Sequence, residues 1–399
     1  MTLLRSLLIV TAAQTAVFAG SADKPAPVST SFADANSLTE YFFGKSNLWD
    51  SSYDSIQQWK KDHHLPIGIG AEHWWHVDTG RYLYGNGYGV PGERGTYRWN
   101  LTFDPSWTFG KDDFVREIGI HALGRFREGD KLRSYFRDNF WAYEAYVYAK
   151  TSVGTFKAGE IAEQFGIGWN NSWWEGTGYF DGYKFTPAYG FSWENSWKGS
   201  DKFSIDTTLQ YFITNSRVSG AIAGADANST LGLSERHTGI AHVVPTWNLA
   251  PDTKLALGVS GLVRGIDSHG IPGISDKQVA WGTDLTFTWK NLSIFGEYID
   301  SHGVITPARY VSGGPSNRQN SVSTGIIYKL GPISPRVSFS KEWDHNPSGH
   351  QYIINPGLTI QIAKNVTLYT EYVKWNVTNS RGVTSRYDNG VEFALVWNF

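Results

Sequence analysis

The chain ends with the stretch Val391–Phe399, which reads VEFALVWNF and has an apolar residue at every second position. These apolar residues are Val391, Phe393, Leu395, Trp397 and the terminal Phe399. Successive side chains of a β-strand point to opposite faces of the sheet, so the stretch predicts a strand with one apolar face. An apolar stripe that continues to the last residue is unusual in a soluble protein and favours a strand that faces lipid.

The same two-residue period extends back along the chain to Pro66. Tyr97, Trp99, Leu101 and Phe103, for example, alternate with polar residues. The pattern predicts strands at residues 67–78, 96–109, 114–126, 140–150, 154–162, 187–197, 202–213, 238–248, 254–266, 279–289, 291–300, 320–330, 334–343, 351–362, 365–375 and 387–399. An even number of strands lets the first and last strands pair, which leaves no free edge. The expected fold is all-β: a transmembrane antiparallel β-barrel of about 16 strands.

Composition excludes several other classes of protein. The 399-residue chain has a net charge of -2 and no Cys, which argues against nucleic-acid binding, disulfide scaffolds and thiolate metal sites. Its mean hydropathy of -0.34 argues against a bundle of membrane-spanning helices. A membrane β-barrel remains compatible, because lipid-facing and lumen-facing residues alternate and their hydropathies cancel.

The N-terminal region predicts export and a short helix. Residues 1–19 have a basic start, an apolar stretch and small residues at the end, as in a secretory signal peptide. The apolar stretch is too short for a membrane anchor. Residues 20–65 are expected to form a leader with an amphipathic helix at about 52–63, capped by Asp50, Ser51 or Ser52, and residues 66–399 the barrel. The expected location is the outer membrane of a Gram-negative bacterium.

Connections of two very different lengths alternate along the predicted barrel. Short turns are expected at 110–113, 198–202, 290–291, 331–334 and 363–365. Long loops are expected at 80–95, 127–139, 163–186, 214–237, 301–319 and 376–387. Outer-membrane barrels have this asymmetry, with short turns on the periplasmic side and long loops outside. Trp and Tyr near strand ends, including Trp107, Tyr143, Trp197, Trp247, Trp289, Trp343 and Trp375, are expected in the aromatic girdles.

Charged residues fall on the face opposite the apolar stripe and are predicted to line a pore. They are Arg98, Glu117, Arg125, Arg127, Glu144, Lys157, Arg264, Asp284, Glu297, Arg336, Glu342 and Glu371. Sixteen strands enclose a lumen too wide for side chains to fill, which favours a water-filled channel. Individual charges could equally serve only to pair with one another. The near balance of signs indicates no strong ion preference and favours neutral solutes.

The third long loop is the predicted constriction. Its candidate residues are Glu163, Trp169, Asn170, Asn171, Trp173, Trp174, Glu175, Tyr179 and Asp181. Aromatic faces beside amide and carboxylate groups suit sugar binding, because CH groups stack on the rings while hydroxyls find donors and acceptors. The alternative is that the aromatic residues only pack the loop against the wall.

No catalytic constellation, metal site or cofactor is predicted, and the chain is not expected to be an enzyme. His73 and His76 lie on opposite faces of one predicted strand by parity, so they do not share a metal. His63 and His64 follow the predicted helix, where a cation interacts favourably with the helix C-terminus.

The whole mature chain resembles the bacterial porins, through the signal peptide, the strand count, the long third loop and Phe399. Within them it looks most like the carbohydrate-selective porin family, through the Trp49–His64 helix before Pro66 and the stretch from Phe156 to Phe165 that leads into the third loop. It departs from that family in having DSSY at residues 50–53, where Gly-Gly and then Arg are common.

The resemblance implies a passive channel, monomeric or homotrimeric, with a constriction used for sugar uptake. The stripe of Phe393, Leu395, Trp397 and Phe399 resembles the signal that the outer-membrane insertion machinery reads. The expected partners are therefore small hydrophilic solutes such as sugars, outer-membrane lipid and that machinery. The alternatives are a general non-selective porin, a barrel plugged by residues 20–65, and an outer-membrane enzyme.

Overall fold

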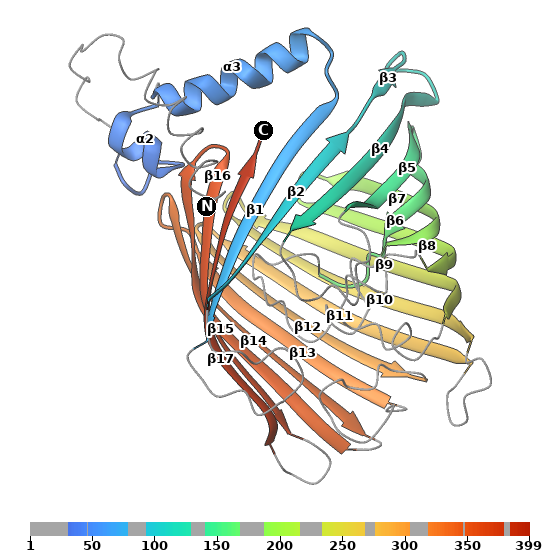
Figure 1. Cartoon of the computed structure of the whole chain (residues 1–399). Helices are drawn as coiled ribbons and strands as arrows, with labels where there is room; N and C mark the ends of the chain where they lie inside the picture. Colours follow the sequence, from blue (N-terminus) through green and yellow to red (C-terminus); the bar gives the residue numbers. More distant parts are fainter. Residues whose placement is uncertain are drawn as a thin grey trace.

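The computed structural model is a closed antiparallel β-barrel with two N-terminal helices at one end (Figure 1). The structure describes residues 31–45, 47–78, 93–128, 140–167, 187–215, 234–267, 276–303, 318–345, 348–378 and 384–399. The first strand, β1 (Ile67–Asp78), pairs with β2 (Glu93–Phe103) on one side and with the last strand, β17 (Thr384–Asn398), on the other. The barrel is thereby closed. The sequence predicted this fold correctly.

The barrel has 16 strands, although 17 strands are labelled. Both β2 and β3 (Ser106–Thr108) pair with β4 (Val115–Glu128), so β2 and β3 are two parts of one barrel strand. The interruption falls at Asp104 and Pro105, where the sequence predicted one continuous strand, and it follows from the missing N–H of proline. The other strands are β5 (Phe140–Thr151), β6 (Gly154–Ala162), β7 (Pro187–Ser200), β8 (Phe203–Asn215), β9 (Ser234–Ala250), β10 (Thr253–Asp267), β11 (Lys277–Trp289), β12 (Leu292–His302), β13 (Arg318–Tyr328), β14 (Ile333–His345), β15 (Ser348–Ala363) and β16 (Val366–Thr378).

The outer face is mainly apolar and the inner face is mainly polar. In β11, exposed Val279, Trp281 and Leu285 alternate with buried Gln278 and Asp284. Directly paired residues of antiparallel strands lie on the same face of the sheet. The pairing of neighbouring strands therefore shows which residues of each strand face outward and which face inward. The alternation predicted from the sequence is therefore the alternation of the barrel wall.

Two predicted girdle residues point inward instead. Trp107, Trp197 and Trp289 are exposed, as expected for a girdle, whereas Tyr143 and Trp375 are buried. Tyr143 lies at a β-bulge between β4 and β5, where the extra residue breaks the alternation. Trp375 has the parity of Glu371 on β16, and its Nε1 donates a hydrogen bond to Gln351 at 3.1 Å.

Two short helices precede the barrel, α2 (Leu38–Phe43) and α3 (Leu48–Asp62). The predicted helix begins earlier than expected, because Asn47 rather than residues 50–52 caps it and accepts a hydrogen bond from the Asp50 N–H. The sequence did not predict α2, which is capped by Ser37. No helix in the described part of the chain has the length and apolar character needed to cross a membrane.

The helices are attached to the end of the barrel that carries the short turns (Figure 1). Trp49 Nε1 donates to Asn365 Oδ1 at 3.0 Å, and the Lys364 N–H donates to Asp50 Oδ1 at 2.9 Å. The Lys364 ammonium also contacts Asp54. The hydrogen bond with Asp54 raises the pKa of Lys364, which lies in the turn between β15 and β16. The described part of the N-terminal segment thus binds the β15–β16 turn.

Candidate functional site

The start of the third long connection runs along the inner wall of the barrel. Residues 163–167 follow β6, and four of these five residues bind a side chain of another strand. The anchors are Glu163 Oε2 with Arg264 Nη2 at 2.7 Å, the Gln164 N–H with Gln210 Oε1 at 2.8 Å, the Gly166 N–H with Ser260 Oγ at 2.9 Å, and the Ile167 N–H with Glu297 Oε1 at 2.9 Å. These partners lie on β8, β10 and β12, so the segment crosses the wall from strand to strand.

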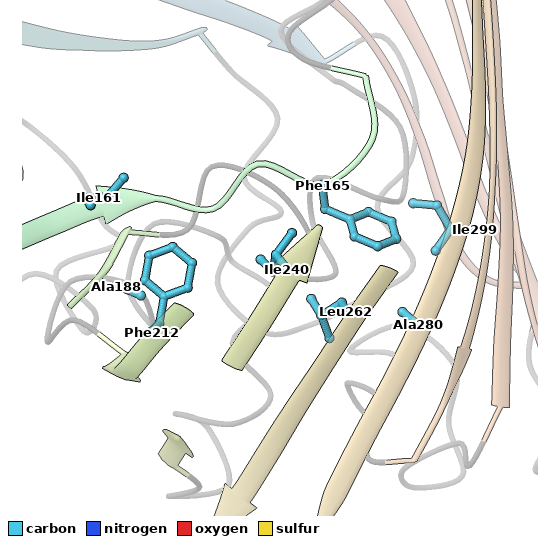
Figure 2. Close-up of a cluster of buried hydrophobic side chains, with 8 residues drawn as sticks. All are labelled: Ile161, Phe165, Ala188, Phe212, Ile240, Leu262, Ala280 and Ile299. Atoms are coloured by element: carbon cyan, nitrogen blue, oxygen red, sulfur yellow. The ribbon is translucent and has the colours of Figure 1, made fainter. Parts of the chain in front are cut away.

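An apolar cluster lies beneath this segment (Figure 2). Its members are Ile161, Phe165, Ala188, Phe212, Ile240, Leu262, Ala280 and Ile299. Phe165 is only 1% exposed, and burial of such a side chain stabilises by about 1.5–3 kcal/mol. A Cβ at Gly282 would lie 3.1 Å from the Phe165 ring, so the absence of a side chain there leaves room for it. The loop start therefore has a small hydrophobic core of its own inside the barrel.

A buried ion-pair triad fixes the point where the connection leaves β6. Arg264 donates from Nη2 to Glu163 and from Nη1 to Glu235, the latter at 3.0 Å. The side chains of Arg264 and Glu163 are only 2% and 1% exposed. Loss of one member of a buried pair leaves an uncompensated charge and costs about 3–5 kcal/mol. The triad therefore holds the loop start strongly to β9 and β10.

Acidic groups continue along the wall beyond the triad. Asp284 and Glu297 are direct partners across β11 and β12, and both are buried. His242 Nε2 lies 3.0 Å from Asp284 Oδ2, while Glu297 binds the Ile167 N–H. Two carboxylates side by side repel each other. Here one is held by a histidine and the other by the loop backbone.

The wall formed by β4 to β7 combines charges with aromatic rings. His121 lies 2.5 Å from Asp104 Oδ1 and 3.7 Å from Glu144 Oε2, and its ring stacks on Tyr146. The Arg125 guanidinium lies 3.6 Å from the centre of the Tyr143 ring. Further along, Lys157 pairs with Glu194 at 2.6 Å, and Glu117 binds Tyr148 and Lys150.

The wall formed by β13 to β17 carries a second buried pair. Arg336 Nη2 donates to Glu371 at 3.0 Å, and Glu371 is the direct register partner of Glu392. Glu342 accepts a hydrogen bond from Gln319 at 2.7 Å. These residues lie on β13, β14, β16 and β17, whereas the described anchors of residues 163–167 lie on β8, β10 and β12.

The structure describes only part of the predicted site. Glu163 lies in the triad, but Trp169, Asn170, Asn171, Trp173, Trp174, Glu175, Tyr179 and Asp181 lie outside the described residues. Arg98 and Arg127 are direct register partners on β2 and β4. The other predicted lining residues, Glu117, Arg125, Glu144, Lys157, Arg264, Asp284, Glu297, Arg336, Glu342 and Glu371, have the inward parity of their strands.

Several anchoring residues were missed from the sequence, namely Phe165, Gln210, Glu235 and Ser260. One signal was present: Phe212 and Ala280 are apolar residues at positions of the otherwise polar face. Apolar residues on a lumenal face indicate that something packs against it. Among the described residues, no group of three or more His, Asp or Glu side chains could hold a metal ion.

Comparison with solved structures assigns the fold. No protein-family model matches the chain, and no curated protein matches it by sequence. A structure of OmpF from Salmonella typhi in complex with daunomycin is 14% identical, with 84% of this chain and 97% of that chain covered and a TM-score of 0.61. The outer membrane channel DcaP of Acinetobacter baumannii is 13% identical, with coverages of 84% and 96% and a TM-score of 0.53. The trimer form of OmpT from Vibrio cholerae is 11% identical, with coverages of 84% and 98% and a TM-score of 0.52. The chain has the fold of an outer-membrane porin-like channel.

Proposed function

We propose that this porin-like chain is a passive outer-membrane channel for small hydrophilic solutes, with sugars as the favoured class. The observation that carries the proposal is the third connection, whose first residues are anchored on the inner wall instead of leaving the barrel. A segment held inside a wide barrel narrows it, and pore width with lining chemistry sets selectivity.

The lining supports an aqueous path. A barrel of 16 strands is too wide for side chains alone to fill. Its inner face carries ion pairs and hydrogen-bonded amides, which favour contact with water over contact with lipid. The exposed apolar outer face in turn supports a location within a membrane.

The preference for sugars rests on the composition of residues 169–181. This segment contains Trp169, Trp173, Trp174 and Tyr179 next to Asn and acidic residues. Rings and amides in one short segment offer a stacking face and hydrogen-bond partners to a sugar. The anchored residues 163–167 lead directly into this segment along the chain.

An open lumen is favoured over a plugged one by the position of α2 and α3. Trp49 and Asp50 of α3 contact the β15–β16 turn at the end of the barrel. A homotrimer is the assembly we propose, on the precedent of the trimer form recorded for the similarly folded OmpT.

Single-channel conductance in a planar bilayer tests the function. We expect stable steps that mono- and oligosaccharides reduce, and we expect W173A/W174A to weaken the block by sugars. The matched control is W197A/W289A, which removes two exposed tryptophans of the outer face and should leave the block unchanged. Steps that sugars never reduce would indicate a general porin, and absence of conductance in folded protein would overturn the channel.

A further inference from the structure

The outer face of β12 to β16 changes from apolar to polar toward the long connections. Nearer the short turns, this face carries exposed Ile326, Val337 and Leu358. Toward the other end it carries charged and polar residues. They are Tyr298, Asp300, His302, Arg318, Asn320, Lys341, His345, Tyr352 and Lys374. The register places them outside, because Asp300 pairs with Trp281 and His302 pairs with Val279, both exposed outer residues.

Asp300 organises the cations of this surface. Its carboxylate is 7% exposed and accepts from Arg318 Nε at 3.3 Å and Nη2 at 3.1 Å. His302 Nε2 lies 3.2 Å from the same carboxylate. The Arg318 side chain nevertheless remains 47% exposed. A buried acid therefore holds an arginine in a defined orientation on the surface of the barrel.

A second layer of hydrogen bonds extends the surface across β14. Asn320 is buried, its amide donates to the Tyr298 hydroxyl at 2.6 Å, and its Oδ1 contacts His345 Nε2. Lys341 lies beside the Trp343 ring, with Nζ 6.0 Å from its centre. Lys374 has the outward parity of exposed Tyr372 on β16. This arrangement is a structured polar surface.

The charges of this surface select an anion. Among the described outward residues at this end of β12 to β16, Arg318, Lys341 and Lys374 are three permanent cations, against the single carboxylate of Asp300. Arginine recognises phosphate through paired N–H donors, and lysine recognises it as a point charge. A polar band directly above an apolar outer band lies at the level of the lipid headgroups.

We propose that the outward surface formed by Asp300, Arg318, Asn320, Lys341 and Lys374 binds the phosphate groups of outer-leaflet lipid. The proposal rests on the outer-membrane location given under the proposed function. It does not depend on conduction, because these residues lie on the outer face and the loop anchors on the inner face.

The experiment measures lipid binding by folded protein in non-ionic detergent, with native mass spectrometry as the readout. The probes are a bisphosphorylated lipid A and the same lipid without phosphates. We expect the phosphorylated lipid to bind at least tenfold more tightly, and R318A/K341A/K374A to lose this difference. The control K111A/K202A/K329A removes three exposed lysines near the short turns and should retain it. Equal binding of the two lipids, or full retention of the difference by the outer-surface variant, would overturn the proposal.

Two further arms separate a built site from simple attraction of charge. D300N makes the surface more positive but releases Arg318, so we expect weaker binding of the phosphorylated lipid. Tighter binding by this variant would contradict the proposed site. Inorganic phosphate at the same concentration should not displace the lipid, and displacement would identify free phosphate as the ligand. Conductance of all these variants should remain normal, so a failure of the lipid site is distinguishable from a failure of the channel.

Discussion

Replacement of Arg264 by Met tests whether the buried triad holds the constriction in place. The change keeps most of the side-chain volume but leaves Glu163 and Glu235 without their shared cation. The expected cost is about 3–5 kcal/mol. Other attachments of the loop start include three backbone hydrogen bonds of about 0.5–1.5 kcal/mol each and the burial of Phe165, worth about 1.5–3 kcal/mol. The expected loss is thus comparable with the sum of these attachments.

We therefore expect R264M to release the loop start for part of the time. In single-channel recordings, the steady level of the parent protein should become a current that switches between levels. The matched control is R336M, which breaks the buried pair between Arg336 on β14 and Glu371 on β16, two strands that carry none of the loop-start anchors described above. R336M should lower the unfolding temperature without added switching. A steady R264M current equal to that of the parent would refute the role assigned to the triad.

Three further predictions concern other contacts of the described chain. F165A should leave a cavity beneath the loop start, destabilise the folded protein by about 3–5 kcal/mol, and produce the same current switching as R264M. An F165A current without added switching would show that the apolar cluster is not needed to hold the loop start. The pKa of Lys364 is raised in the folded protein, so its pairing with Asp54 stabilises the folded state fully below the ordinary lysine pKa. This stabilisation is lost as the pH rises through the raised pKa. Protease cleavage within α3 should therefore increase with alkaline pH in the parent protein and be independent of pH in D54N. Removal of Phe399 deletes its backbone hydrogen bonds with Ile69, at 2.6 and 2.8 Å. If Phe399 is also an assembly signal, the yield of folded protein in cells should fall far more than the yield of refolding in detergent. Equal losses would indicate that Phe399 acts only by closing the barrel.

The fold was predictable because alternation is a local property of the sequence. Each strand must present apolar side chains to one face, so the predicted 67–78 and 154–162 strands match β1 and β6. The ends of other strands differ because pairing continues past the last apolar residue. The predicted strand 238–248, for instance, is part of β9, which reaches back to Ser234.

The site was less predictable, since its contacts join residues far apart in the sequence. Glu163 and Arg264 are 101 positions apart, and parity alone does not indicate which pairs meet. Bulges add a second difficulty. At Tyr143 one extra residue reverses the expected face, so a ring assigned to the lipid side packs against Arg125 inside.

Ion preference is where the structure changes the interpretation of the wall most. The sequence suggested nearly balanced charges, but inward acids were missed: Glu72 bonded by Asn100, Glu194 paired with Lys157, and Glu235 paired with Arg264. Arg264 is thus shared by two carboxylates, and Glu371 adjoins Glu392, so these parts of the described wall are net acidic. We therefore expect a channel that passes small cations more readily than anions, measured as the sign of the reversal potential in a KCl gradient.

Substitution of the acids locates the origin of that preference. E194Q and E72Q each remove one inward carboxylate outside the loop triad, and each should shift the reversal potential toward zero. Higher salt should reduce the parent's preference, because it screens the field of charges that line water. A reversal potential that indicates anion preference in the parent protein would mean that the charge of the described wall does not control permeation. The controlling residues would then have to be sought in the rest of the third connection, residues 168–186.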